Sequence, residues 1–259
     1  MPERMFSIIT VTLNSGKALE KTVASVSAQD FSDYEHLIKD GGSEDSSVLA
    51  IFLNPKARLI TSPDQGIYDA MNQALEACQG RFVIFLNAGD VLADRMVLRK
   101  IADRLREKET DLLYGCVVQD GVRLNYPEIL SEWYMVRNSI CHQAWVLRRS
   151  SCLAVGGFNL DYRVLADHYM LLDLICNHQI SYQFFKDSIV SLAPMGFSAV
   201  NWRLKREERN RMVAFFFGGL RGRLLRLMHA ATFPGARIWL SKKRYSRKIY
   251  CKISNLFNQ

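Results

Sequence analysis

The chain has 259 residues, 49% of them hydrophobic and 23% charged, and a formal net charge of +8 at pH 7. This hydrophobic content can bury the core of one large domain, which excludes global disorder. Its six cysteines are irregularly spaced without a C-x-x-C pair, which favours reduced thiols over a zinc cage or a dense disulfide scaffold. The first apolar run becomes polar at Asn14, too early for a secretory signal, so we expect a cytoplasmic protein.

Short apolar runs followed by polar residues mark the first half of the chain, at residues 6–11, 34–39, 58–61 and 81–86. Continuous apolar runs of this length are typical of buried parallel strands. Helical spacing of apolar residues follows the first, third and fourth runs, beginning at Leu19, Ile67 and Val97. The alternation predicts an α/β fold, with a Rossmann-like, mostly parallel sheet and helices on both faces.

Further elements are predicted in the second half of the chain. The pattern indicates strands at residues 112–118 and 142–147, a turn at Gly156-Gly157-Phe158, and a helix from about Asp161 to Asn177. No internal repeat or low-complexity segment interrupts it.

Polar residues follow each of the first four predicted strands. They are Thr12 and Asn14, then Asp40, then Asp64, and finally Asn87 with Asp90. Open α/β sheets bind ligands just beyond the carboxyl ends of their strands, so we expect these side chains to share one polar crevice.

Asp40 begins the sequence Asp40-Gly41-Gly42-Ser43-Glu44-Asp45. A carboxylate at a strand end can accept the imide N–H of uracil or the amino group of another base. The alternative is a capped turn in which the glycines let the backbone bend and Ser43 or Asp45 caps a helix. For Asp45 we favour that structural role.

The run from Asp64 to Asn72 opens the helix after the third strand. Its spacing places Asp69 and Asn72 on one face, away from Ile67 and Met71, where both can point into the crevice. An acidic first turn favoured by the helix dipole is an equal alternative for Asp64 and Asp69, although it leaves Asn72 unexplained.

Asp90, in the loop Asn87-Ala88-Gly89-Asp90, is the candidate metal ligand. Mg²⁺ and Mn²⁺ prefer oxygen ligands and are commonly held by one or two carboxylates together with substrate phosphates. Where a DXD-type arrangement has its first acid, this chain has Asn87, a neutral ligand or hydrogen-bond donor.

Asp167 and His142 are the remaining candidates. Asp167 lies in the late predicted helix, where a carboxylate can be a general base or simply a surface residue. His142 precedes an apolar run and can contact a phosphate, a metal or an acceptor, although a lone histidine is more often structural.

Together these motifs resemble family 2 glycosyltransferases with the GT-A fold, of the kind that builds bacterial exopolysaccharide and O-antigen units, including the colanic acid type. The resemblance covers about the first 200 residues, and residues 62–72 are its most specific part. The sequence differs from the family at Met195-Gly196-Phe197-Ser198, where related enzymes often have Gly-Gly before a small residue and Ser. The resemblance therefore does not identify the acceptor.

The resemblance implies an inverting transferase that uses a nucleotide-diphosphate sugar and Mg²⁺ or Mn²⁺. It implies Asp167 as catalytic base, Asp90 on the metal and diphosphate, and His142 on the acceptor or phosphate side. The residues assigned to the donor nucleotide are Thr12, Asn14, Asp40, Asp64, Asp69, Asn72 and Asn87.

The positive charge is concentrated in the tail. From Asn201 onward fifteen Lys and Arg face two Glu, a net charge of +13 against +8 for the whole chain, which leaves −5 for residues 1–200. We therefore divide the chain into a glycosyltransferase domain at 1–200 and a basic, amphipathic helical tail at 201–259.

The tail combines this charge with the apolar run from Met212 to Leu220, which is too short to span a bilayer. It can lie in the interface of an anionic membrane, which predicts a peripheral protein on the inner face of the cytoplasmic membrane and a lipid-linked saccharide acceptor. A helix packed on the catalytic domain is the alternative. Nucleic acid is not expected as a partner, because no recognition module accompanies the charge.

Three other functions can be weighed against the sequence. A sugar nucleotidyltransferase needs a Gly-rich, basic phosphate loop after the first strand, where this chain has Thr12-Leu13-Asn14-Ser15-Gly16-Lys17. A non-catalytic nucleotide-sugar scaffold is expected to lack Asp90 or Asp167, and both are present. A dehydrogenase is disfavoured because no G-x-G-x-x-G follows any strand.

Overall fold

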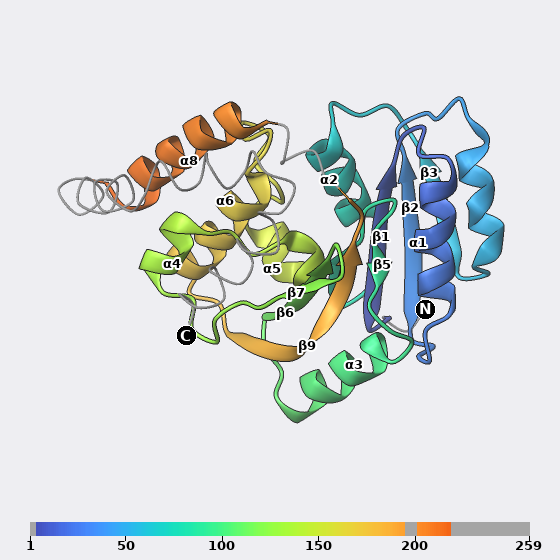
Figure 1. Cartoon of the computed structure of the whole chain (residues 1–259), viewed down its shortest axis with the longest axis horizontal. Coiled ribbons are helices and arrows are strands. Elements are labelled where there is room, and N and C mark those ends of the chain that lie inside the picture. The colour runs from blue at the N-terminus through green and yellow to red at the C-terminus, as the bar shows by residue number, and fades with distance from the viewer. Residues whose placement is uncertain (1–3, 195–200, 219–259) are drawn as a thin grey trace.

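The computed structural model describes residues 4–194 and 201–218 (Figure 1). Within these ranges one sheet has the strand order β3-β2-β1-β4-β8-β6-β9-β5, with β7 paired to β6. The strands are β1 (Phe6–Thr12), β2 (Tyr34–Asp40), β3 (Ala57–Thr61), β4 (Phe82–Phe85), β5 (Val91–Leu92), β6 (Leu112–Gln119), β7 (Val122–Leu124), β8 (Trp145–Arg148) and β9 (Tyr182–Leu192). Most paired residues lie in parallel ladders, as the sequence predicted.

The helices connect these strands. The α-helices are α1 (Lys17–Ser27), α2 (Ile67–Ala77), α3 (Val97–Glu107), α4 (Glu132–Arg137), α5 (Arg149–Ala154), α6 (Ala166–Leu172) and α8 (Trp202–Phe216). The 3-10 segments are η1 (Ser46–Leu53) and η2 (His142–Ala144), and η3 (Asp173–Asn177) is a π-helical turn.

The first four strands run parallel, in the order β3-β2-β1-β4. All seven residues of β1 are buried, including Ser7, Thr10 and Thr12, because this parallel strand is covered on both faces. In the register, Thr12 of β1 stands beside Asp40 of β2, and Asp40 beside Thr61 of β3. The predicted convergence of polar strand ends on one edge of the sheet is therefore confirmed.

Both faces of the sheet are covered by helices (Figure 1). On one face Leu19 and Val23 of α1 pack with Ile38 of β2 and Ala50 of η1 in a small core. On the other face Met71 of α2 belongs to the main core. Burying the apolar stripes of these helices supplies most of the driving force for the fold.

β8 lies between β4 and β6 and runs antiparallel to both. It therefore borders the parallel strands β1 to β4. The strand predicted at 142–147 begins only at Trp145. Residues His142–Ala144 form η2 instead, because the N–H of Ala144 bonds to the carbonyl of Cys141, 2.9 Å away, within its own turn.

The helix predicted from 161 to 177 is shorter than expected, since α6 starts at Ala166 and the last turn, η3, is π-helical. The physical reason is a buried carboxylate, that of Glu208, which accepts hydrogen bonds from the backbone N–H groups of residues 163–165.

α8 packs on the rest of the molecule and lies beside α6 in Figure 1. Its residues Met212 and Val213, with Phe217 just beyond its end, belong to the main hydrophobic core. The start of the basic tail is thus a packed helix, and residues 219–259 lie outside the described ranges. Within the described residues no helix is long and apolar enough to cross a membrane.

Candidate active site

The loops after β1 and β2 are tied together at the carboxyl edge. Asn14 has a left-handed backbone, with φ of 49°, and its N–H donates to the Ser43 hydroxyl at 2.8 Å. Its side-chain oxygen accepts the N–H of Glu44 at 2.9 Å. Thr12 is hydrogen-bonded to Ser15 at 2.6 Å between their hydroxyls. These contacts hold two of the predicted donor-binding residues in fixed places.

The Asp40 carboxylate is 2% exposed and bonded within its own turn. It accepts the N–H groups of Gly42 and Ser43, each at 3.1 Å, and the Ser43 hydroxyl at 2.5 Å. Gly42 has φ of +100°, which an L side chain rarely adopts. Asp45, in turn, caps η1 by accepting the N–H of Ser47, so its predicted structural role is confirmed. The base-recognition role of Asp40 stays a prediction.

Lys39 was not predicted from the sequence as part of the site. Its side chain is fully buried, and Nζ lies 3.0 Å from Oδ2 of Asp64. The same ammonium donates to the carbonyls of Ser62 at 2.7 Å and Asp40 at 3.2 Å. This buried cation joins the ends of β2 and β3 and fixes the carboxylate of Asp64. The available signal was a lysine directly after Leu37-Ile38 and before Asp40, near the end of the strand.

Asp69 and Asn72 are both engaged within the protein. Asp69 accepts the N–H of Gln65 at 2.8 Å and the amide of Gln73 at 3.1 Å, as expected for an acid in the first turn of a helix. The amide of Asn72 pairs with both the N–H and the carbonyl of Phe158, each at 2.8 Å. Asn72 thus fixes the turn predicted at 156–158, and the donor-binding roles of both residues stay predictions.

Asp90 is 5% exposed at the end of the loop after β4. Its Oδ1 accepts the N–H of Ala193 and its Oδ2 the amide of Gln143, each at 2.8 Å. Burial raises the pKa of the Asp90 carboxyl, although these hydrogen bonds oppose the shift. A cation beside it would restore the ionised form, because an opposite charge favours a carboxylate.

His142 connects Asn87 to Asp167. Its Nδ1 lies 3.1 Å from Oδ2 of Asp167, and its Nε2 lies 3.2 Å from the amide nitrogen of Asn87. An amide nitrogen only donates, so in this arrangement Nε2 is the acceptor and Nδ1 carries the N–H that faces Asp167. This N–H donates a hydrogen bond to the Asp167 carboxylate and so orients the carboxylate.

The Asp167 carboxyl is ionised at neutral pH. Burial on its own raises the pKa of this group, but the hydrogen bonds from the His142 side chain and from the backbone N–H of His168 oppose burial, and the pKa lies below its ordinary value. His168 itself is neutral, because complete burial lowers its pKa to about 3. Asp167 is therefore a carboxylate able to accept a proton.

The two predicted acids are joined through adjacent residues of η2. His142 contacts Asp167, and Gln143, the next residue, contacts Asp90. Gln143 was not among the predicted site residues, although the motif His142-Gln143-Ala144 contains it. The antiparallel β8 brings this turn to the carboxyl edge beside β4.

The residues around Asp90 offer few ligands for the predicted metal. In the described part of the chain no group of three or more His, Cys, Asp or Glu side chains is placed to hold a metal ion. Asp90 offers a carboxylate, and the buried side-chain oxygen of Asn87 has no hydrogen-bond partner. This oxygen-rich loop fits Mg²⁺ or Mn²⁺ only if phosphate oxygens and water complete the coordination. The acceptor-side motif at Met195–Ser198 lies outside the described residues.

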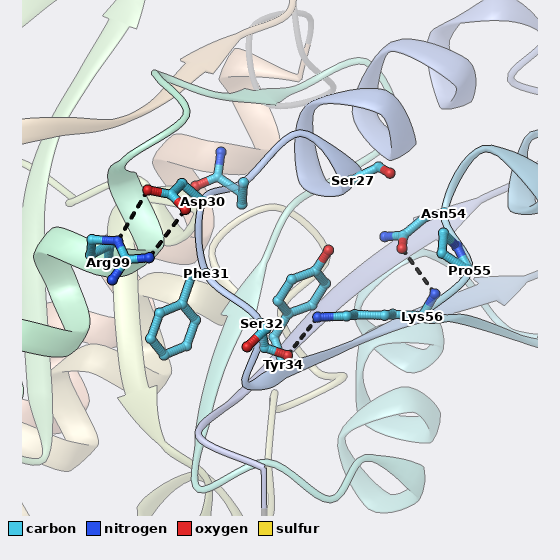
Figure 2. Close-up of a pocket in the computed structure, with 10 residues that line it drawn as sticks. Ser27, Asp30, Phe31, Ser32, Tyr34, Asn54, Pro55, Lys56 and Arg99 are labelled. Atoms are coloured by element: carbon cyan, nitrogen blue, oxygen red, sulfur yellow. Dashed lines mark hydrogen bonds and ion pairs between the residues drawn. The ribbon is translucent and has the colours of Figure 1, made fainter.

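A separate hollow of about 350 Å³ lies at the opposite, amino end of β2 (Figure 2). Its charged groups are already engaged within the protein: Arg99 pairs with Asp30, and Lys56 donates to the carbonyl of Ser32 and lies over the Tyr34 ring. The strand length separates this hollow from the acids of the carboxyl edge.

Comparison with known proteins agrees with this architecture. The structure is similar to S. aureus TarS 1-349 in complex with UDP-GlcNAc, with a TM-score of 0.69 and 17% identity over 94% of this chain and 77% of that one. It is also similar to the mannosyltransferase PcManGT from Pyrobaculum calidifontis in complex with GDP-Man and Mn²⁺, with a TM-score of 0.63 and 15% identity over 99% and 87% of the chains. The GT-A fold expected from the sequence is confirmed.

Residues 7–153 match the family described as Glycosyl transferase family 2, and the chain belongs to this family. A PGL/p-HBAD biosynthesis glycosyltransferase of Mycobacterium bovis is 34% identical over 174 residues, which cover 64% of this chain and 68% of that protein. The O-antigen biosynthesis protein RfbC of Myxococcus xanthus is 26% identical over 189 residues, which cover 66% of this chain but 14% of that protein.

Proposed function

We propose that this glycosyltransferase is inverting and metal-assisted, and that it transfers a sugar from a nucleotide-diphosphate sugar to a hydroxyl of a saccharide acceptor. The observation that carries the proposal is the pair of acids at one sheet edge, Asp90 and Asp167, joined through His142 and Gln143. The similar structures named for UDP-GlcNAc and for GDP-Man with Mn²⁺ support the donor class and the metal.

The donor nucleotide is assigned to the loops after the parallel strands. In this proposal Asp40 recognises the base, and Asn87 with Asp90 lies against the diphosphate and metal. Lys39 supports the site indirectly by fixing Asp64. The remaining proposed donor-side residues are Thr12, Asn14, Asp69 and Asn72. Mg²⁺ or Mn²⁺, held by Asp90 and the diphosphate, supplies positive charge to the departing group.

The reaction is a single displacement. The acceptor hydroxyl oxygen forms a bond to C1 of the donor sugar while the bond from C1 to the diphosphate oxygen breaks. The hydroxyl proton passes to the Asp167 carboxylate, and the bonding electrons leave with the nucleoside diphosphate. His142 holds the carboxylate in place through its Nδ1–H. Attack opposite the leaving group inverts the configuration at C1.

The test of this mechanism is the Asp167→Asn variant, assayed for sugar transfer and for donor binding. Loss of a positioned base typically costs about 10² to 10⁴-fold in rate, and we expect donor affinity to be retained. The exposed Asp161 offers a matched control as Asp161→Asn. Retained transfer in the Asp167→Asn enzyme would remove Asp167 from the base role.

A panel of UDP-, GDP- and dTDP-sugars with Mn²⁺ identifies the donor. The transferase mechanism releases a nucleoside diphosphate, whereas a sugar nucleotidyltransferase would consume pyrophosphate and release a nucleoside triphosphate. Binding of a nucleotide sugar without turnover in the presence of any acceptor would favour the scaffold alternative.

We further propose that the acceptor is lipid-linked and that the basic tail docks on an anionic membrane. The RfbC relative is named for O-antigen biosynthesis, which supports a surface saccharide. The packing of α8 means that residues 201–218 also stabilise the domain. Membrane binding is therefore tested in the full chain, by replacing Lys242, Lys243 and Arg244 with Gln.

Neutralising these three cations should weaken binding to anionic vesicles by about 1 kcal/mol per charge. Vesicles of phosphatidylserine and phosphatidylcholine, sedimented with each protein, provide the measurement, and pure phosphatidylcholine vesicles are the control. Equal sedimentation of both proteins with anionic vesicles would contradict docking through this cluster.

A further inference from the structure

Glu208 is a buried carboxylate of α8, only 4% exposed. It accepts three consecutive backbone N–H groups: those of Arg163 at 2.7 Å, Val164 at 3.0 Å and Leu165 at 2.9 Å. Consecutive N–H groups that converge in this way form a concave site for an anion. A side chain far along the sequence therefore fixes this loop.

The loop held by Glu208 leads directly into α6, whose second residue is Asp167. Leu165 is the N-cap of α6, and no side chain of its own caps that end. The N–H groups at and before a helix start need partners when they are buried. Glu208 supplies them, so it determines where α6 begins and where its first turn points.

Neighbouring residues of α8 hold other parts of the same region. The guanidinium of Arg209 donates to the carbonyls of Val136 and Arg137 at the end of α4, the segment that leads to His142. Arg211 donates to the carbonyl of Asp161 and lies 4.2 Å from the ring centroid of Tyr162. One face of α8 thus contacts the chain segments that carry both His142 and Asp167.

We propose that α8 is a positioning element of the active site, and that Glu208 acts through residues 163–165 to set Asp167 against His142. The inference rests on the base role proposed for Asp167. The hydrogen bonds of Glu208 go to backbone N–H groups, so it acts on Asp167 through the chain rather than by direct contact. Through Glu208, α8 at the start of the tail consequently has a positioning role, in addition to the membrane docking proposed for the tail.

The test is the isosteric Glu208→Gln variant in the full chain. An amide has one acceptor oxygen and places an N–H group toward donors, so it cannot satisfy all three backbone N–H groups. Misplacement of a catalytic group by about 1 Å can cost about 100-fold in rate. We expect kcat to fall by about 10 to 100-fold, with KM for the nucleotide sugar unchanged because its binding loops lie after β1 to β4.

Glu207 provides a matched control, because it is the adjacent glutamate on α8 and is exposed. Glu207→Gln should leave kcat and KM unchanged. If Glu208→Gln does not fold, Arg211→Gln replaces an exposed side chain on the same helix and should show a smaller loss of kcat, again with KM for the donor unchanged.

A folded Glu208→Gln enzyme with the kcat of the natural protein would overturn the inference, and so would equal losses of kcat and donor affinity, which indicate general disruption. Should Glu208→Gln fail to fold, an unchanged kcat in Arg211→Gln would overturn it. Asp167→Asn separates the two levels: if that variant is inactive while Glu208→Gln is normal, only the positioning role fails, whereas an active Asp167→Asn enzyme removes the base role and this inference with it.

Discussion

The Nδ1 atom of His142 lies 3.1 Å from the Oδ2 atom of Asp167, although the two residues are 25 positions apart. The other ring nitrogen faces the amide of Asn87. This arrangement directs the N–H of Nδ1 at the Asp167 carboxylate. The pH dependence of turnover should therefore depend on a residue that does not touch the reacting atoms.

Replacing His142 by Ala should raise the pKa of Asp167, because the hydrogen bond and nearby imidazole that lower it are lost. A base works when deprotonated, so turnover falls as the pH drops through its pKa, and the acidic limb should move to higher pH. His142→Asn, whose amide can donate near the position of Nδ1, should recover part of the rate. The kcat profile between pH 4 and 8 provides the measurement.

The exposed His178 is the matched control, since His178→Ala removes an imidazole away from the site. If the acidic limb of the kcat profile lies at the same pH in His142→Ala as in the natural enzyme, His142 does not lower the pKa of Asp167.

Asp90→Asn should weaken activation by Mn²⁺. The substitution removes the negative charge of the one carboxylate assigned to the metal, while an amide can still accept the hydrogen bond from Ala193. Activity is measured after chelation and during titration with Mn²⁺, and we expect the half-saturating concentration to rise by about 10-fold or more. Asp94→Asn, at an exposed aspartate, is the control. Identical titration curves for Asp90→Asn and the natural enzyme would exclude Asp90 as a ligand.

The buried pair of Lys39 and Asp64 should be important for stability. Lys39→Met leaves the Asp64 carboxylate without its cation, and breaking a buried ion pair typically costs about 3 to 5 kcal/mol. Urea unfolding of Lys39→Met, Asp64→Asn and the double variant separates the pairwise energy from the single effects. The exposed pair of Lys100 and Asp94 is a control expected to contribute less than about 1 kcal/mol. A cost for Lys39→Met as small as that control would refute the prediction.

Stability should decrease as the pH falls below about 6.5, the ordinary pKa of histidine in an unfolded chain. Complete burial lowers the pKa of His36 and of His168 to about 3 each, so both stay neutral in the folded protein while the unfolded chain takes up protons. Between the pKa of the unfolded chain and that of the folded protein, each histidine lowers the free energy of unfolding by about 1.4 kcal/mol per unit decrease in pH. Urea unfolding at pH 7, 6 and 5 measures it.

His36→Gln retains a donor toward Thr10 but does not titrate. Its free energy of unfolding should fall less steeply over the same pH range. Equal slopes for the two proteins would show that His36 does not carry this dependence.

The parallel half of the fold was predictable because its signal is local. Each of the first four strands is a short segment with adjacent apolar residues followed by a polar loop, and parallel pairing brings their carboxyl ends to one edge. That reasoning placed Thr12, Asp40, Asp64 and Asp90 correctly at strand ends. It also gave the starts of α2 and α3.

The contacts between distant segments were not predictable in this way. Asn72 bonds to the backbone of Phe158, 86 positions later, and Glu208 bonds to Leu165, 43 positions earlier. A single sequence contains no periodicity that reports such partners. The same limitation explains why the helix before Ala166 was predicted too long, since the distant Glu208 side chain binds the backbone N–H groups of residues 163–165. The strand before Trp145 was predicted too long for a local reason, the backbone hydrogen bond from Ala144 to Cys141 within η2.

The antiparallel insertion of β8 between β4 and β6 has a consequence for synthesis of the protein on the ribosome. Strands β1 to β4 and their helices are complete before β8 emerges, so the nucleotide half can begin to fold early. Asp90 receives its bond from Gln143 only later, and the loop before Asp167 gains Glu208 only when α8 has been made. The nascent chain thus forms the strands that carry the donor-binding loops well before Asp167 is held in position.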